Sequence, residues 1–197
     1  MVTLGSARSD ADRLSPGRRK RVTVAEYHGL LDTGRLAEDD RVELLEGEIV
    51  EMSPQDKPHA RALARLNRIF TRALGDAFVV RPQLPLTLAD SEPEPDLAVV
   101  RAEDEAAAPR HPSTALLVVG IADSSVQKDL ERKGRIYARA DVPEYWLVQV
   151  KLRSVLVLRA PDPGSGTYRD VRTLGPDGSL ATDAFPGPQI AVHTLFD

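Results

Sequence analysis

The chain has 197 residues, 42% of them hydrophobic and 28% charged, and a formal net charge of −4. This length and composition predict one large or two small folded domains and exclude a chain that is disordered throughout. Because there is no cysteine, disulfides and thiolate zinc sites are excluded. The longest apolar stretch, 115–121, is far shorter than the roughly 20 residues of a membrane span. No apolar signal-peptide segment follows the first basic residues, so we expect a cytoplasmic protein.

Charge is distributed unevenly along the chain. Residues 1–21 carry six basic and two acidic side chains, a net charge of +4, which leaves −8 on the rest. We interpret residues 1–21 as a disordered basic arm, compatible with either a solvated tail or a contact to nucleic acid. The acidic remainder disfavours tight non-specific DNA binding, which depends on phosphate neutralisation, but it does not exclude a local basic groove.

The N-terminal third contains three predicted elements. Thr23 and Glu26 have the spacing of a capping box, which predicts a helix from there to about Leu31. The segments 41–45 and 48–52 flank Glu46-Gly47, a pair typical of a two-residue hairpin turn. A loop over 53–58 follows, with prolines at both 54 and 58.

Residues 60–74 form the clearest predicted helix, because their apolar residues recur at helical spacing. Four arginines separated by 4, 3 and 4 residues form one basic stripe on this helix: Arg61, Arg65, Arg68 and Arg72. The stripe is compatible with an ordinary solvated face and with contact to a phosphate backbone.

The rest of the chain predicts a mixed sheet. Segments 78–81 and 84–88 contain or adjoin prolines, which is typical of an edge or irregular strand. Segment 115–121 is apolar on both faces, as in a central strand. A helix over 126–140 then leads to a strand at 145–150, which indicates a parallel, right-handed crossover. The remaining predictions are a strand at 96–100, a loop at 102–113, strands at 154–159 and 189–195, and a turn at Asp177-Gly178.

These elements predict one α/β domain over residues 22–197, with a central mixed β-sheet flanked by helices. Asp96 follows Pro95 at the start of a strand, and the strand at 115–121 is its expected neighbour. Carboxylates on two adjacent strands suit Mg²⁺, but the second strand has Gly120 where such a residue would point inward.

Lys133 lies three residues after Leu130 and four before Tyr137, so it shares their helix face. A lysine on such a face either snorkels to the edge or serves a site. Glu43 and Glu48 in the hairpin are either solvated or part of that site, and His59 caps or lines the helix after Pro58. We find no Ser–His–Asp order, glycine-rich phosphate loop or metal-spaced histidine pair. The residues by themselves support a magnesium-dependent carboxylate–lysine site at one edge of a sheet.

Four segments resemble the Uma-type family of putative restriction endonucleases, which is assigned to the PD-(D/E)XK nuclease superfamily. They are 41–52 (RVELLEGEIVEM), 91–100 (SEPEPDLAVV), 122–125 (ADSS) and 142–148 (VPEYWLV). The resemblance covers about residues 22–197 in the right order. It implies a restriction-endonuclease-like fold, DNA as partner, and hydrolysis of phosphodiester bonds with Mg²⁺ or Mn²⁺.

The resemblance also assigns roles to residues. Asp96 takes the place of a metal ligand, Lys133 that of the superfamily lysine, and Glu43 that of a peripheral metal ligand. Gly120 stands where the family has its second acidic ligand, and Arg132 where a glutamate commonly precedes the lysine. The resemblance therefore implies an endonuclease with impaired cleavage, unless Glu43 or Asp123 compensates. The alternative is a non-catalytic nuclease-fold module that binds nucleic acid or a protein partner; by analogy with related nucleases we also expect a homodimer.

Overall fold

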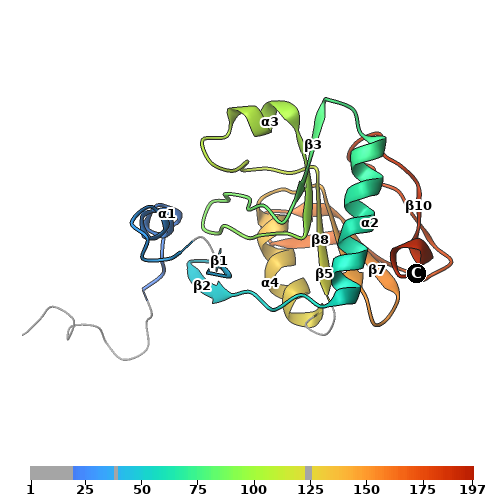
Figure 1. Cartoon of the computed structure of the whole chain (residues 1–197), viewed down its shortest axis with the longest axis horizontal. Coiled ribbons are helices and arrows are strands. Elements are labelled where there is room, and N and C mark those ends of the chain that lie inside the picture. The colour runs from blue at the N-terminus through green and yellow to red at the C-terminus, as the bar shows by residue number, and fades with distance from the viewer. Residues whose placement is uncertain (1–19, 38–39, 123–125) are drawn as a thin grey trace, which may run out of the picture.

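A six-stranded mixed sheet forms the centre of the molecule, in the order β3-β4-β5-β6-β7-β8 (Figure 1). The computed structural model describes residues 20–37, 40–122 and 126–197, so most of the predicted basic arm and Asp123 lie outside the described residues. Only β5 and β6 are parallel, and the other neighbours are antiparallel. The strands are β3 (Phe78–Pro82), β4 (Leu97–Arg101), β5 (Leu117–Ala122), β6 (Glu144–Gln149), β7 (Ser154–Asp162) and β8 (Thr167–Leu174).

One long helix covers each face of this sheet. On α2 (Lys57–Ala73) the buried side chains include Leu66 and Phe70, which pack on one face with Trp146. On α4 (Val126–Arg139) the buried Ile136 and Tyr137 pack on the other face. Nearly all side chains of β4 and β5 are buried. Since successive side chains of a strand point to opposite faces of the sheet, both faces of these two strands are covered. The predicted single α/β domain, with its parallel β5–α4–β6 crossover, is confirmed.

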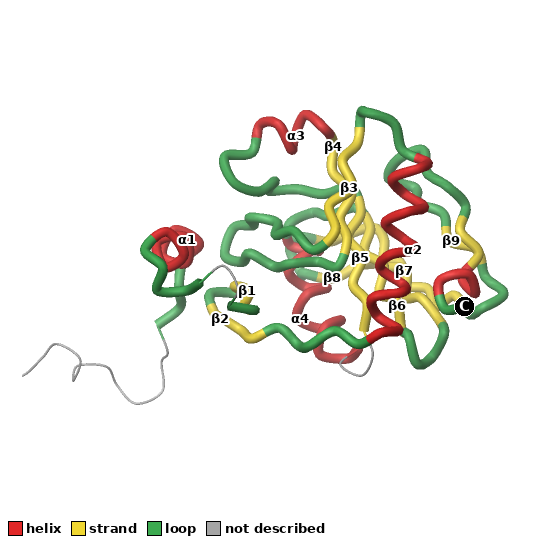
Figure 2. The backbone as a smooth tube through the Cα atoms, viewed as in Figure 1, coloured by secondary structure: helices red, strands yellow, loops and turns green. Residues whose placement is uncertain are grey.

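A small N-terminal unit lies beside this body (Figure 2). It consists of α1 (Val24–Asp32) and the antiparallel hairpin of β1 (Val42–Leu45) and β2 (Glu48–Glu51). The capping box is confirmed, because Glu26 N donates to Thr23 Oγ1 and Thr23 N donates to Glu26 Oε2. At the hairpin turn both Glu46 (φ 48°) and Gly47 (φ 77°) have positive φ, as the favoured two-residue hairpin turn requires.

Two predictions around α2 and β3 are wrong. The helix begins at Lys57, earlier than predicted, because Asp56 is its N-cap and accepts from His59 N at 2.9 Å. Pro58 therefore lies in the first turn, where its missing N–H is no loss. Residues 84–88 form a loop rather than a strand, since Leu86 N and Leu88 N donate to Pro93 and Ser91 in the segment that follows. As predicted, β3 is an edge strand.

The C-terminal half differs from the predictions in three places. A short helix, α3 (Ala102–Ala107), occupies part of the predicted loop at 102–113 and has three acidic residues in its first turn, where the helix dipole favours them. The edge strand β8 was not predicted. The predicted strand at 189–195 is the two-residue strand β10 (Ile190–Ala191), paired with β9 (Ser179–Leu180), and then a 3₁₀ helix over Val192–Leu195.

The longest helix of the described residues is α2, with 17 residues. None of the described helices is both long and apolar enough to cross a membrane.

Candidate active site

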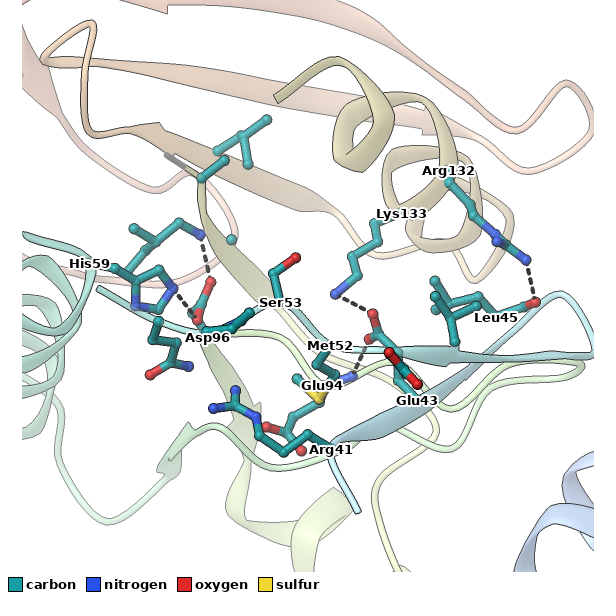
Figure 3. A pocket seen from close by; sticks show the side chains of 18 of the residues that line it. Arg41, Glu43, Leu45, Met52, Ser53, His59, Glu94, Asp96, Arg132 and Lys133 are labelled. Carbon is teal, nitrogen blue, oxygen red and sulfur yellow. Dashed lines mark hydrogen bonds and ion pairs between the residues drawn. The ribbon is translucent and has the colours of Figure 1, made fainter. Parts of the chain in front are cut away.

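A cavity of about 690 Å³ lies between the hairpin, the first turn of α2, the end of β5 and α4 (Figure 3). Four positions singled out in the sequence line it: Glu43, Asp96, Gly120 and Lys133. Residues from four separate segments therefore meet in one place. The arginine stripe of α2 does not line the cavity; Arg61, Arg68 and Arg72 are exposed, and Arg65 is half-buried.

Asp96 is held at both of its carboxylate oxygens. It directly precedes β4, and its Oδ2 accepts from the backbone N–H of Ile121 on β5 at 2.6 Å. Its Oδ1 lies 2.8 Å from Nε2 of His59 on α2. The carboxylate is thus fixed between the neighbouring strand and the helix that covers this sheet (Figure 3).

Lys133 and Glu43 form an ion pair on the opposite side of the cavity (Figure 3). Lys133 Nζ lies 2.9 Å from Glu43 Oε1, and Glu94 N donates to Glu43 Oε2 at 3.1 Å. Glu43 is 6% exposed, so its charge is withdrawn from water and needs these partners. Lys133 thus lines the cavity and is paired with Glu43; that it serves a site stays a prediction.

Gly120 lies beside Asp96 at the end of the β4–β5 ladder. The register ends with Leu97 paired to Val119; Asp96 directly precedes Leu97 and Gly120 directly follows Val119, so continuing the antiparallel pairing by one residue brings Asp96 opposite Gly120. Directly opposed residues have Cβ atoms about 4.5–5.5 Å apart on the same face. A Cβ at residue 120 would meet Tyr145 Oη at 2.9 Å and Leu147 Cδ1 at 3.3 Å. The Tyr145 hydroxyl therefore occupies space that a side chain at residue 120 would need.

The described residues do not fit the metal site that the resemblance implies. Within the described ranges, no group of three or more histidine, aspartate and glutamate side chains could hold a metal ion. All four oxygens of Asp96 and Glu43 already have protein partners within 3.1 Å, and residue 120 offers no oxygen from a side chain. Mg²⁺ demands near-ideal octahedral geometry, so we derive no chemical step through a metal.

Glu94 adds a further carboxyl group to the cavity lining. Burial and the nearby charge of Glu43 raise the pKa of Glu94 above its usual value, against the opposing effect of Arg41. The cavity therefore disfavours the ionised form of this carboxyl group.

Arginines on α4 fix the hairpin to the helix through Glu46. Its carboxylate lies 2.8 Å from both Nε and Nη2 of Arg135 and 3.1 Å from Nη1 of Arg139. The hydrogen bond from Arg135 is the main reason that the pKa of Glu46 is lowered. Arg132 donates to Leu45 O and to Glu48 Oε2. We call these contacts between the hairpin and the arginines of α4 the clasp. Glu48 belongs to the clasp and does not line the cavity that contains Asp96.

Comparisons with known proteins show the family and the fold of the chain. The model of the Uma2 family, described as a putative restriction endonuclease, matches residues 24–193. The chain belongs to the Uma2 family. A crystal structure of a putative nuclease of the DUF820 family, from Anabaena variabilis ATCC 29413, is similar with a TM-score of 0.68 and 15% identity. The similarity covers 89% of this chain and 97% of that one, and it supports the fold alone. No curated protein matches.

Sequence reasoning missed two members of this Uma2 cavity, His59 and Glu94. His59 was noted only as a residue near the start of a helix, and no second histidine lies at a ligand-like spacing. Glu94 lies in the proline-rich acidic run before Asp96. The presence of Glu94 two residues before Asp96 was the available signal, but in an irregular segment this spacing does not predict a shared face.

Proposed function

We propose that the cavity is a DNA phosphodiester site of the endonuclease type and that glycine at residue 120 impairs cleavage. The observation that supports this most directly is the placement of Gly120 opposite Asp96, in a cavity that also contains Lys133 and Glu43. A nuclease-like function agrees with the Uma2 family and with the fold. The substrate, the metal dependence and the impairment are our proposal.

Phosphoryl transfer depends mainly on positioning and on electrostatic stabilisation of the phosphate. In this cavity the Lys133 ammonium would bind a phosphate oxygen while Glu43 holds its chain in place. Asp96 supplies one fixed negative charge. Without a second carboxylate opposite Asp96, nothing at residue 120 completes a cation site, so DNA is bound better than it is cut.

A non-catalytic module that binds nucleic acid is the second candidate. Its support is that each of the two central carboxylates already has a partner within the protein, His59 for Asp96 and Lys133 for Glu43. Both candidates place DNA at the same cavity, so a cleavage assay separates them. The homodimer, a protein partner and the cytoplasmic location stay predictions.

The test is cleavage of supercoiled plasmid with Mg²⁺ or Mn²⁺ by the native chain and by Gly120→Glu. Because the Tyr145 hydroxyl crowds this position, Gly120→Glu/Tyr145→Phe is included, with Tyr145→Phe alone as its control. Gly120→Gln has nearly the same size as the glutamate but no charge. We expect cleavage to rise at least about tenfold in the glutamate variants and not in Gly120→Gln, since a carboxylate brings both a ligand oxygen and a negative charge to a divalent cation, whereas a neutral amide brings no charge.

Asp96→Ala in each background controls for a contaminating nuclease. If only the glutamate variants cut and Asp96→Ala abolishes this activity, the proposal holds. If the native chain cuts in an Asp96-dependent manner as fast as the glutamate variants, the impairment is refuted. If no variant cuts although all are folded and bind DNA, the non-catalytic module is favoured.

A further inference from the structure

We propose that His59 is a positioning residue of the site, which sets the orientation of the Asp96 carboxylate through the contact between His59 Nε2 and Asp96 Oδ1. This inference rests on the proposed function for its activity readout, but its structural readout is independent of that function. His59 lines the same cavity as Asp96, Gly120 and Lys133.

The sequence around His59 builds a rigid platform for its ring. Asp56 caps α2 by accepting from His59 N at 2.9 Å, and Pro58 restricts the backbone of the same turn. His59 is 8% exposed, so packing limits the rotation of its ring. A ring held in this way imposes its direction on its hydrogen-bond partner.

The second step concerns where the ring carries its hydrogen. Asp96 Oδ1 lies 2.8 Å from Nε2, and in the proposed contact Nε2–H is the donor and the carboxylate oxygen is the acceptor. The other ring nitrogen, Nδ1, is buried and has no hydrogen-bond partner among the described residues. The contact to Asp96 is therefore the polar contact of this ring that can couple its orientation to the site.

The third step concerns the carboxylate. Its Oδ2 is held by Ile121 N on β5, and its Oδ1 by His59 on α2. With both oxygens held from different elements, rotation about the Cβ–Cγ bond breaks at least one contact. Partners that orient a functional carboxylate in this way typically change activity about 10- to 100-fold when they are removed.

A matched control exists elsewhere in the chain. His28 Nε2 lies 2.6 Å from Glu92 Oε2, also in a partly buried histidine–carboxylate pair, but neither residue lines the cavity. If His59 has a purely structural role, replacing His59 or His28 should change DNA cleavage to the same extent. If His59 is a positioning residue, only its replacement should lower turnover.

The experiment compares His59→Ala, His59→Gln and His28→Ala, each in the Gly120→Glu background with DNA cleavage as readout. The glutamine amide can replace Nε2–H as donor to Asp96. We expect His59→Ala to lower kcat at least about tenfold with little change in KM, His59→Gln to retain most of the activity, and His28→Ala to leave kcat unchanged. Equal losses in His59→Ala and His28→Ala, or no rescue by glutamine, would overturn the proposal.

A second measurement uses the native chain and needs no cleavage. Nitrogen-15 NMR of the histidine rings should show the His59 hydrogen on Nε2, and Asp96→Ala should shift these ring signals while those of His28 stay in place. If Gly120→Glu does not cut but this signature is present, the proposed function fails and the Asp96–His59 contact stands. If the hydrogen is on Nδ1 alone, or Asp96→Ala leaves the ring signals unchanged, the His59 proposal fails by itself.

Discussion

Charged side chains in the cavity are paired with partners inside the protein. Lys133 and Glu43 form such an ion pair, and both side chains are largely withdrawn from solvent. Lys133→Met would leave Glu43 with the Glu94 N–H as its one remaining hydrogen-bond partner among the described residues. Because an unpaired buried charge is costly, we expect a loss of about 2–4 kcal/mol in the free energy of unfolding. Urea denaturation at pH 7 measures it.

Glu43→Gln/Lys133→Met removes both charges, and it should recover more than half of that loss. If the double variant is as unstable as the sum of the single variants, the two side chains do not stabilise each other. The ion pair would then have no energetic role.

Glu94 is expected to destabilise the fold at neutral pH. Its pKa is raised, first by burial and then by the charge of Glu43, so the folded state binds its proton more tightly than the unfolded state. The resulting cost is absent below pH 4.5 and develops as the pH rises through the raised pKa. Glu94→Gln should therefore unfold at a higher urea concentration than the native chain at pH 7, and at the same concentration at pH 4. A lower midpoint at pH 7 would contradict this explanation.

At the scale of elements, the clasp between Glu46 and α4 positions the hairpin that carries Glu43. The hydrogen bond from Arg135 lowers the pKa of Glu46, so its stabilising contribution is complete above pH 4.5 and is lost as the pH falls through the lowered pKa. We expect Glu46→Gln to cost about 1 kcal/mol at pH 7, since its arginine partners are partly exposed.

The stability cost of Glu46→Gln should disappear in strong acid, where Glu46 is protonated in the native chain as well. At pH 7 the backbone amides of β1 and β2 should exchange hydrogen faster in Glu46→Gln than in the native chain. Glu48→Gln is the matched control, because Glu48 contacts Arg132 of the same helix from a more exposed position. Equal effects of the two variants would show that Glu46 has no special role in the clasp.

The helix α2 connects the cavity with the basic stripe. Its first turn supplies His59, and Arg61, Arg68 and Arg72 are exposed further along it. If DNA that enters the cavity follows this helix, Arg61→Gln/Arg68→Gln/Arg72→Gln should weaken binding uniformly across sequences. The slope of log K against log salt should fall in magnitude by up to about 0.9 for each contacting arginine.

Fluorescence anisotropy of labelled duplex DNA at several salt concentrations measures both quantities. Replacing three arginines that lie away from the cavity and from α2, Arg101, Arg169 and Arg172, changes the net charge equally and serves as control. An unchanged slope in the α2 variant would assign the stripe to an ordinary solvated face.

At the scale of the whole molecule, patterns of local periodicity predicted the fold well. The apolar run at 115–121 correctly indicated a central strand, and the strand–helix–strand order indicated its parallel neighbour. The strand β8 escaped prediction because Tyr168 is its only buried side chain, so the strand lacks a regular alternation of apolar residues. The early start of α2 escaped because proline was read as a helix breaker, whereas the first turn tolerates it.

The candidate site was predictable where a regular element determines the direction of a side chain. Strand alternation placed Gly120 toward the cavity, and helical spacing placed Lys133 there. The His59 and Glu94 positions depend on how the first turn of α2 and the loop before β4 pack on the sheet. Such contacts join segments far apart in the chain, and no local pattern encodes them.

Whether the missing carboxylate at residue 120 limits cleavage is decided by the cleavage rate of Gly120→Glu relative to the native chain, on the same plasmid with Mn²⁺. We predict a rise of at least about tenfold that disappears in Gly120→Glu/Asp96→Ala, because the two facing carboxylates act together. A Gly120→Glu protein that is folded and binds DNA but cuts no faster than the native chain, with or without Tyr145→Phe, would contradict the account.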